Sequence, residues 1–184
     1  MSTLTRDLYV PCIDKNTILP IIGKETSGEG YNWGRIDKST IFELSFNPQE
    51  ETSGYIDAPN DSTYVKSYQP ELPQEIILDS DNPIYALLQP FFMAMPTGSN
   101  AKVPFLLVLP NMDDGKPTLG YVWDECILSP SSLSSVDGKL SFSCKLNGTV
   151  KVGTVAIDGG NITFSESNTV ALAGNSAPVI ADWN

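Results

Sequence analysis

The sequence contains no histidine, and this absence excludes several kinds of active site. Serine or cysteine nucleophiles that need a histidine base are ruled out, as are zinc sites with histidine ligands. The phosphate-binding motif G-x-x-x-x-G-K-S/T and the patterns G-x-G-x-x-G and G-x-S-x-G are also missing. Carboxylates remain as acid–base groups, but adjacent ones on a strand point to opposite faces. The adjacent pairs are Glu50-Glu51, Asp113-Asp114 and Asp124-Glu125. A glycosidase with two distant carboxylates stays open as an alternative, but we expect that the protein is not an enzyme.

Cysteine is scarce, and its spacing argues against disulfides and metal sites. Cys12, Cys126 and Cys144 are an odd number without a C-x-x-C pair. Cys126 and Cys144 stand among apolar residues, so we expect them to be small buried side chains. Asp79, with the residues that follow it, begins like a calcium loop but lacks the glycine that such a loop requires, and a helix cap explains these residues better. The sequence therefore implies no cofactor and no metal.

Long hydrophobic runs are absent as well. No apolar run reaches the length of about 18 residues that suggests a membrane-spanning helix. The first 20 residues lack the apolar segment of a secretory signal, so we expect synthesis in the cytoplasm.

Basic residues are few, with 11 against 22 acidic ones, for a net charge of −11. They are scattered singly, whereas tight binding to a phosphate backbone needs clustered lysine and arginine. The acidic surface serves solubility, or it belongs to a protein that lets a polyanion pass without holding it. Composition leaves both interpretations open.

The sequence contains several stretches in which apolar and polar residues alternate. From Leu140 to Leu146 every second residue is apolar, which predicts a half-buried strand. Asn147-Gly148 predicts a type I′ turn after it, and "DGGN" predicts another. The stretch "LGYVWDECILSP" predicts a strand with Val122 and Cys126 on one face and Trp123 on the other. Further strands are predicted at residues 40–47, 73–79 and 101–110, the last of them buried on both faces or lying between sheet and helix.

One helix is predicted at about residues 82–94. Asp81 or Asn82 can cap it, Pro83 falls at its first position, and Pro90 is expected to end or kink it. The expected fold is mainly β: an antiparallel β-sandwich or barrel-like fold with one flanking α-helix.

The predicted division of the chain has three parts. Residues 1–30 form an N-terminal arm with one or two short strands, residues 31–165 a β domain, and residues 166–184 a C-terminal extension. Within the β domain, residues 49–68 form a long acidic loop or a protruding hairpin.

A β-rich domain with a long polar loop and no reactive site is typical of an assembly subunit. Edge strands offer unpaired backbone groups to a neighbouring copy, and head-to-tail contacts can close a ring. The predicted contact residues between subunits are Glu50, Glu51, Tyr55, Ile56, Asp57, Tyr64 and Trp183.

The succession "WGRIDKSTIFELSFNPQEETSGYI", "KSYQPELPQEIILDSDNPIYALL", "VPFLLVLP" and "DECILSPSSLSSVDGKLSFSCKLNGTVKVGTVAIDGGNITF" resembles the major tail tube protein of long, non-contractile-tailed bacteriophages. The resemblance covers about residues 30–165. It implies a fold shared with the tube protein of type VI secretion, and hexameric rings stacked into a tube through which DNA passes without tight binding. It also implies that residues 49–68 reach the next ring.

The implied partners are further copies of the chain and the tail tape measure, tail terminator and baseplate or initiator proteins, without a membrane. The implied location is the virion tail, after synthesis in the cytoplasm of a host bacterium. A secretion-system tube protein and a carbohydrate-binding or adhesion β-sandwich module remain the alternatives.

Overall fold

The computed structural model of the protein describes residues 17–25, 31–54, 61–79, 82–110, 117–158 and 160–171. Within these ranges the chain is mainly β, and all strand pairings are antiparallel. The elements are β1 (Leu19–Glu25), β2 (Tyr31–Arg35), β3 (Pro48–Ser53), β4 (Ser62–Tyr68), β5 (Glu71–Ile77), α1 (Pro83–Met93), a 3-10 turn η2 (Gly98–Ala101), β6 (Lys102–Pro110), β7 (Pro117–Ser134), β8 (Lys139–Asp158) and β9 (Asn161–Ala171). The expected fold class, antiparallel β with one flanking helix, is confirmed.

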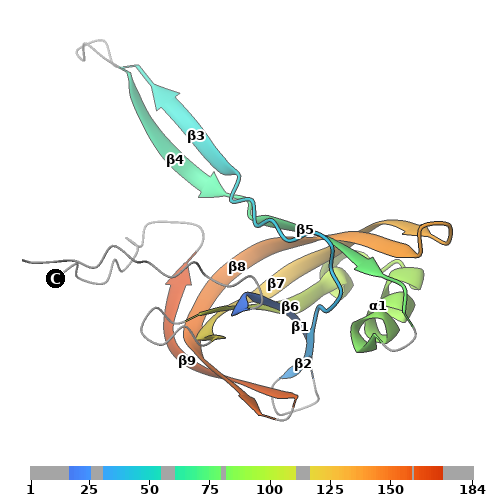
Figure 1. The fold of residues 1–184 in the computed structure, drawn as a ribbon. Coiled ribbons are helices and arrows are strands. Elements are labelled where there is room, and N and C mark those ends of the chain that lie inside the picture. Colours follow the sequence, from blue (N-terminus) through green and yellow to red (C-terminus); the bar gives the residue numbers. More distant parts are fainter. Residues whose placement is uncertain are drawn as a thin grey trace, which may run out of the picture.

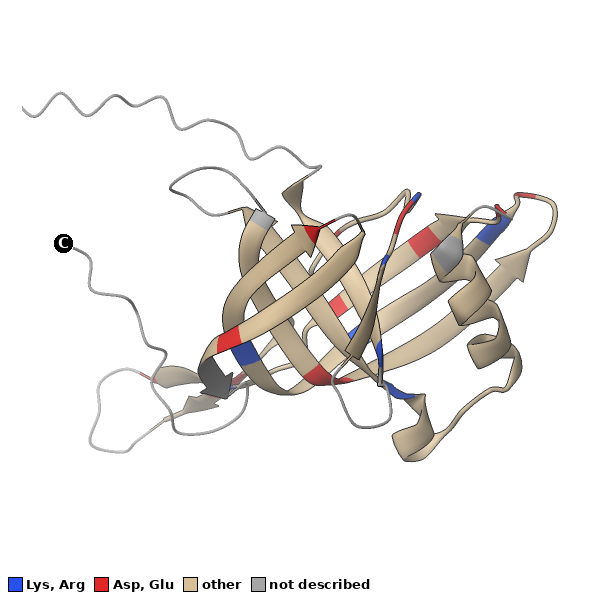
Figure 2. Ribbon diagram, turned by 90° about the horizontal axis from the view of Figure 1, so that it is seen from below, with Lys and Arg blue, Asp and Glu red and all other residues tan. Residues whose placement is uncertain are grey.

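One curled sheet forms the body of the molecule. Its strand order is β2-β1-β6-β7-β8-β5, and β9 pairs with β8 as well. β8 pairs with β7 along one edge, and its other edge is shared between β5 at residues 139–145 and β9 at residues 149–158. β2 contacts β9, so the sheet curls into the barrel-like body seen in Figures 1 and 2. β3 and β4 form a separate two-stranded sheet.

Apolar side chains are buried on both faces of the curled sheet. The larger cluster lies between the sheet and α1, where the rings of Phe92 and Phe142 are 5.4 Å apart. The smaller cluster lies on the other face, where Phe164 of β9 packs against it. β6 serves both, because its adjacent residues Phe105 and Leu106, each 0% exposed, belong to different clusters. This confirms the prediction of an apolar strand that is buried on both faces.

Helix α1 begins where the sequence predicts. Asn82 is its N-cap, and the side-chain oxygen of Asn82 accepts a hydrogen bond from the backbone N–H of Ile84 at 3.2 Å. Pro83 occupies the first helical position, where no N–H is needed. The Asn82 Nδ2 also donates to the carbonyl of Asp37 at 3.3 Å, so one side chain both starts the helix and ties it to the segment after β2.

Pro90 does not end the helix, which continues to Met93. A proline removes the hydrogen bond to the carbonyl four residues earlier, here that of Ala86. Both Pro90 and Ala86 are exposed, so water can hydrate that carbonyl. Within the described ranges, no helix has the length and apolar character that crossing a membrane requires.

The prediction of a hairpin turn at Asn147-Gly148 is wrong. β8 runs through both residues without interruption, and Gly148 has a φ of +83° inside the strand. Trp123 of β7 pairs with Val150, whereas Glu125 pairs with Asn147, so β8 carries one more residue than β7 between these pairs. This is a β-bulge, which uses a glycine at positive φ as a turn does. The next predicted turn, at "DGGN", is confirmed by the hairpin that joins β8 to β9.

The predicted faces of β7 are also corrected. Trp123 and Cys126 were expected on opposite faces, but both are buried in the larger cluster. The reason is a register shift, because Val103 of β6 pairs with Cys126 while Phe105 pairs with Trp123. Between these two pairs β7 has one residue more than β6, so Trp123 and Cys126, three residues apart, point to the same face of the sheet.

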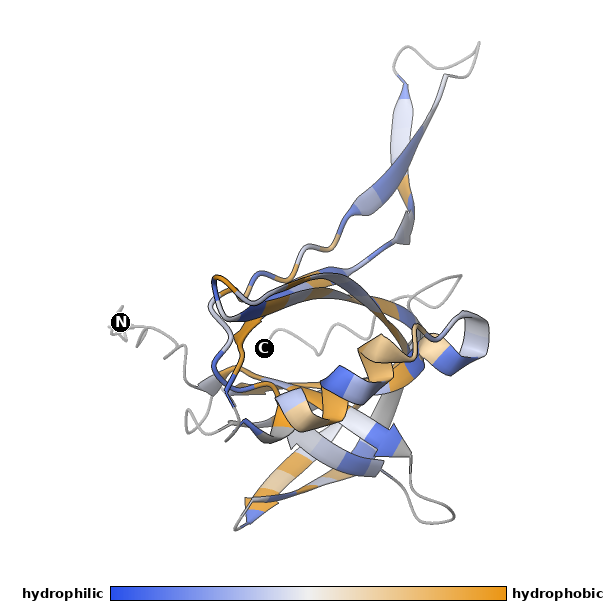
Figure 3. Cartoon of the chain, turned by 90° about the vertical axis from the view of Figure 1, so that its right-hand side faces the viewer, coloured by the Kyte–Doolittle hydropathy of each residue, from blue (hydrophilic) through white to orange (hydrophobic). Residues whose placement is uncertain are grey.

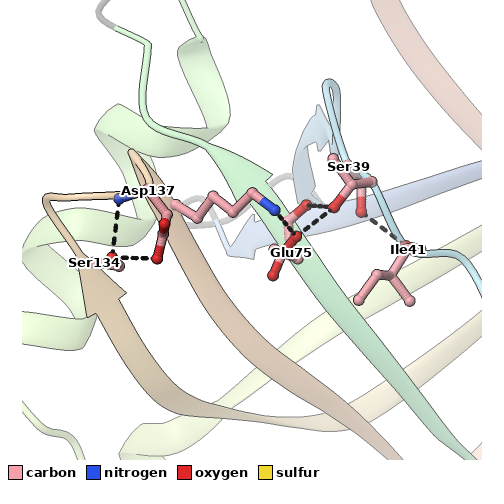
Figure 4. A network of polar contacts seen from close by, with 7 residues as sticks. Ser39, Ile41, Glu75, Ser134 and Asp137 are labelled. Carbon is pink, nitrogen blue, oxygen red and sulfur yellow. Dashed lines mark hydrogen bonds and ion pairs between the residues drawn. The ribbon is translucent and has the colours of Figure 1, made fainter.

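Residues 38–47, which we call the strap, include the predicted strand at 40–47 but form only isolated bridges to β5. Lys38 and Asn47, at the two ends of the strap, have positive φ values, and between them only Ser39 and Ser45 form bridges to β5. A polar network holds the strap: the Glu75 carboxylate accepts hydrogen bonds from the Thr40 hydroxyl and the Lys139 ammonium, both at 2.7 Å (Figure 4).

The sheet extends beyond the predicted limits of the β domain at both ends. Residues 19–25, within the predicted N-terminal arm, form β1, which pairs with both β2 and β6 and buries Ile21 and Ile22. At the other end β9 continues to Ala171, past residue 165. Residues 1–16 and 172–184 of the predicted extensions lie outside the described residues.

Candidate interaction surface

β3 and β4 form a hairpin that we call the arm (residues 48–54 and 61–68). The arm stands away from the body and is mostly hydrophilic (Figures 1 and 3). Its register runs from Pro48 paired with Tyr68 to Ser53 paired with Ser62. Nearly every side chain of the arm is exposed, so no other described element covers either of its faces.

The two faces of the arm carry different groups. On one face, Lys66 lies 3.4 Å from the carboxylate of Glu51, and the Tyr64 hydroxyl hydrogen bonds to the same carboxylate, which raises the pKa of Tyr64 above its usual value. On the other face, Glu50 pairs with Val65. Glu50 makes no ion pair within the described part of the chain. Among the described residues, the arm therefore has one face whose charges are paired and one with a carboxylate that has no ion-pair partner, beside an exposed valine.

Three predicted contact residues, Glu50, Glu51 and Tyr64, lie together on the arm. Tyr55, Ile56 and Asp57 belong to residues 55–60, between the two strands, and Trp183 belongs to residues 172–184. Both stretches lie outside the described residues. The role of all seven residues in contacts between subunits stays a prediction.

Sequence reasoning missed several exposed apolar side chains. The strap exposes Phe42 and Phe46, the latter to 59%, and the turn between β7 and β8 exposes Val136 to 94%. On the arm, Val65 and Tyr68 are also exposed. The adjacent pair Ile41-Phe42 was the available signal, because two neighbouring apolar residues cannot both face one core from an extended chain.

Unpaired strand edges accompany this exposed apolar surface. Among the described strands, β2 pairs only with β1, and β3 and β4 pair only with each other. The strap bonds to the outer edge of β5 at a few positions, such as the backbone N–H of Ser45 to the carbonyl of Glu71 at 2.9 Å. Backbone groups on a strand edge that have no partner form a template for pairing with another chain.

A groove separates α1 from β1 and β6. Its volume is about 530 Å³, and apolar side chains line it, among them Leu87 and Phe91 of the helix and Val103 of β6. Lys24 and Lys102 are the charged residues of its lining, which includes no acidic residue. Lys102 lies 2.9 Å from Glu125, whereas Lys24 makes no ion pair with any described residue.

Reactive groups are sparse in the described part of the chain. It holds no cluster of three or more cysteine, aspartate or glutamate side chains that could bind a metal ion. Cys126 and Cys144 are buried and free, as predicted, and burial raises the pKa of the Cys144 thiol well above its usual value, so the thiol stays protonated. The described surface features above are exposed apolar side chains, strand edges and charged groups.

No protein-family model and no curated protein matches the sequence. Among solved structures, the chain is similar to the tube-terminating cap of the anti-feeding prophage, with 12% identity and a TM-score of 0.48 over 91% of this chain and 100% of that chain. It is similar to a chain of the PVC sheath–tube complex, an extracellular contractile injection system in its extended state, with 12% identity and a TM-score of 0.46 over 84% of this chain and 100% of that one. For Hcp1 from Salmonella typhimurium the identity is 15% and the TM-score 0.31, over 77% of this chain and 93% of that one. These identities and TM-scores lie below the values at which a likeness shows a shared function.

Proposed function

We propose that this protein is a structural, non-enzymatic subunit that assembles with copies of itself into stacked rings, forming the tube of a non-contractile bacteriophage tail. The observation that carries the proposal is the arm. A two-stranded hairpin is marginally stable in water at best, and three strands or a packing surface are needed for independent stability. The arm has neither within the described chain, so contact with another copy supplies what the monomer lacks.

The exposed apolar side chains support association of the same kind. The strap and the arm expose aromatic residues at separate places, including Phe46 and Tyr64. A specific protein contact buries about 1,600 Å² in total, and such a contact is built around apolar and aromatic residues. A subunit in a stacked ring has neighbours on several sides, so these separate surfaces can all be covered at once.

The charge pattern supports passage of DNA through the tube. Charged residues are scattered over the strands and do not form a basic stripe (Figure 2). Several lysines are neutralised by carboxylates, such as Lys139 by Glu75 at 2.7 Å and Lys151 by Asp124 at 3.0 Å. With a net charge of −11, such a subunit gives DNA little to hold. In this proposal the rings are hexameric, the tube lies in the virion tail, and its further partners are the tape measure, terminator and baseplate or initiator proteins.

A carbohydrate-binding module is the second candidate, and one observation favours it. The rings of Tyr31 and Trp33 lie 5.1 Å apart beside a hollow of about 360 Å³ that Asp124 and Lys151 also line. Aromatic faces with nearby polar groups suit sugar rings, and binding on a glycan array that is lost in a Trp33→Ala variant would favour this candidate. A secretion-system tube is a variant of the first proposal, with the same self-assembly and a different cargo.

Deletion of residues 50–64 tests the proposal. We expect the variant, closed by a short glycine linker between Gln49 and Val65, to fold and stay monomeric, because the arm contributes nothing to the two apolar clusters. Negative-stain microscopy at high protein concentration measures tube formation, circular dichroism checks the fold, and substitution of the exposed Val136 by serine is the control that keeps the arm. Normal tubes from the deletion variant would refute the role of the arm. Failure of the intact chain to assemble at any concentration, with or without tail initiator proteins, would refute the proposed function.

A further inference from the structure

We propose that the arm of one copy docks in the groove between α1 and β6 of a second copy, with Glu50 of the arm facing Lys24 of the groove. This inference rests on the proposed function and names the receptor surface for the arm. The occupant is therefore a second copy of this chain, and the contact is heterologous, since the arm and the groove are different surfaces.

The groove can receive a surface that carries a few apolar groups and an acidic one, because its lining is apolar with two lysines. Leu87 and Phe91 line the groove on the side of α1, and Val103 and Pro104 line it on the side of β6, so both sides are apolar. Its volume of about 530 Å³ lies within the range of roughly 300–1,000 Å³ that is usual for binding pockets. Leu87, Phe91 and Val103 are each half-buried, and a docked partner would remove their remaining surface from water.

One face of the arm matches this groove. Glu50 and Val65 pair directly. Two residues further towards the tip, Thr52 pairs with Thr63 on the same face, and their hydroxyl oxygens are 3.0 Å apart. One of the two threonine hydroxyls donates to the other, and the apolar groups that this face carries are the threonine methyl groups and the side chain of Val65. Val65 is 43% exposed, and no described element covers it.

The charges select this face over the opposite one. The carboxylate of Glu51 is already engaged by Lys66 and Tyr64, whereas Glu50 has no ion-pair partner in the described chain. In the groove, Lys102 is engaged by Glu125 at 2.9 Å, whereas Lys24 makes no such pair in the described ranges. Docking of the face that carries Glu50 brings together two opposite charges that have no ion-pair partner in the described ranges, and it sets Glu50 against a lining without acidic residues. This charge match favours one register of the contact.

Charge exchange between these two positions tests the contact. Lys24→Glu and Glu50→Lys should each raise the protein concentration needed for assembly by roughly fivefold, because each replaces an exposed attraction by a repulsion. The double variant should return to the intact value, since the pair is restored in reverse. The control combines Lys24→Glu with Asp158→Lys, which has the same net charge but places the new lysine at the exposed end of β8, outside the arm, the strap and the groove, and it should not restore assembly.

A cross-link locates the contact directly. Val65→Cys on the arm and Ala86→Cys in the groove lining are made in separate chains. Both chains also carry Cys12→Ser. The other two native cysteines, Cys126 and Cys144, are 0% exposed and can stay. Mixing and mild oxidation under assembly conditions should give a disulfide-linked dimer on a non-reducing gel, and neither chain alone should give one. Ile157→Cys, exposed near the turn between β8 and β9, replaces Ala86→Cys as the control partner and should not cross-link with Val65→Cys.

The outcomes separate this inference from the proposed function. Restored assembly in the double variant and the specific cross-link support the docking. Normal assembly in all variants, or tubes without either signal, overturns the docking while the tube proposal stands. Absence of assembly by the intact chain overturns both.

Discussion

Alanine substitutions at Phe105 and Leu106 should destabilise the protein by similar amounts, although these neighbours point to opposite faces of β6. Each side chain is 0% exposed, and each belongs to a different apolar cluster. Truncation of a buried phenylalanine costs about 3–5 kcal/mol and that of a buried leucine about 2–5 kcal/mol in free energy of unfolding, from lost transfer energy and the cavity left behind. A domain of this size shifts its melting temperature by about 2–4 °C per kcal/mol, so a loss of about 3 kcal/mol lowers it by roughly 6–12 °C.

Urea denaturation followed by circular dichroism measures these losses. A total stability of about 5–15 kcal/mol leaves room for either variant to remain folded at 25 °C. Leu133→Ala, on the exposed end of β7, is the matched control, and it should change the free energy of unfolding by less than about 0.5 kcal/mol. A loss below about 1 kcal/mol at either Phe105 or Leu106 would refute the account of β6 as a strand between two cores.

Two further predictions concern a close contact in the sheet and the anchor of the strap. Gly153→Ala should destabilise the protein more than Gly120→Ala in the same denaturation assay. The added Cβ at Gly153 would lie 2.1 Å from a backbone oxygen, which cannot easily move, whereas at Gly120 the nearest atom is a side-chain methyl at 2.5 Å. Equal losses of unfolding free energy in the two variants would contradict this prediction. The hydrogen bond from Lys139 lowers the pKa of Glu75 below its ordinary value of 4.5, so the stability that this carboxylate contributes is present above that pH and is lost as the pH falls through the lowered pKa. The intact chain and Glu75→Gln should therefore differ in melting temperature at pH 7 and converge as the pH falls below 4.5, and a difference that persists at low pH would show another cause.

Local chemistry made parts of this fold predictable from the sequence. The cap of α1 follows from Asn82 and Pro83, whose effects act within one turn of the chain, and β6 follows from an apolar run that suits burial on both faces. The hairpin between β8 and β9 likewise follows from the residues within its turn.

The wrong predictions concern segments whose local sequence fits two different backbone structures. Gly148 at positive φ serves a turn or a bulge equally well, and only pairing with β7 along its whole length decides for the bulge. The strap has the composition of a strand, but its edge-on contact with β5 depends on the polar network around Glu75, which joins residues far apart in the chain. The groove could not be predicted for the same reason, because α1 and β6 come together only through the fold.

The arm contributes no residue to either apolar cluster, so the contacts that fold the body are different from those the arm offers to another chain. The body buries its apolar residues on both faces of the sheet without help from the arm, so a single chain can fold. The arm gains little from that folding, because its strands pair only with each other and its side chains remain in water. In the proposed docking, the free energy that the arm gains would be free energy of association. It would depend on protein concentration, whereas the stability of the body would not. If the proposed docking is correct, the chain should stay folded and separate at low protein concentration and assemble at high concentration.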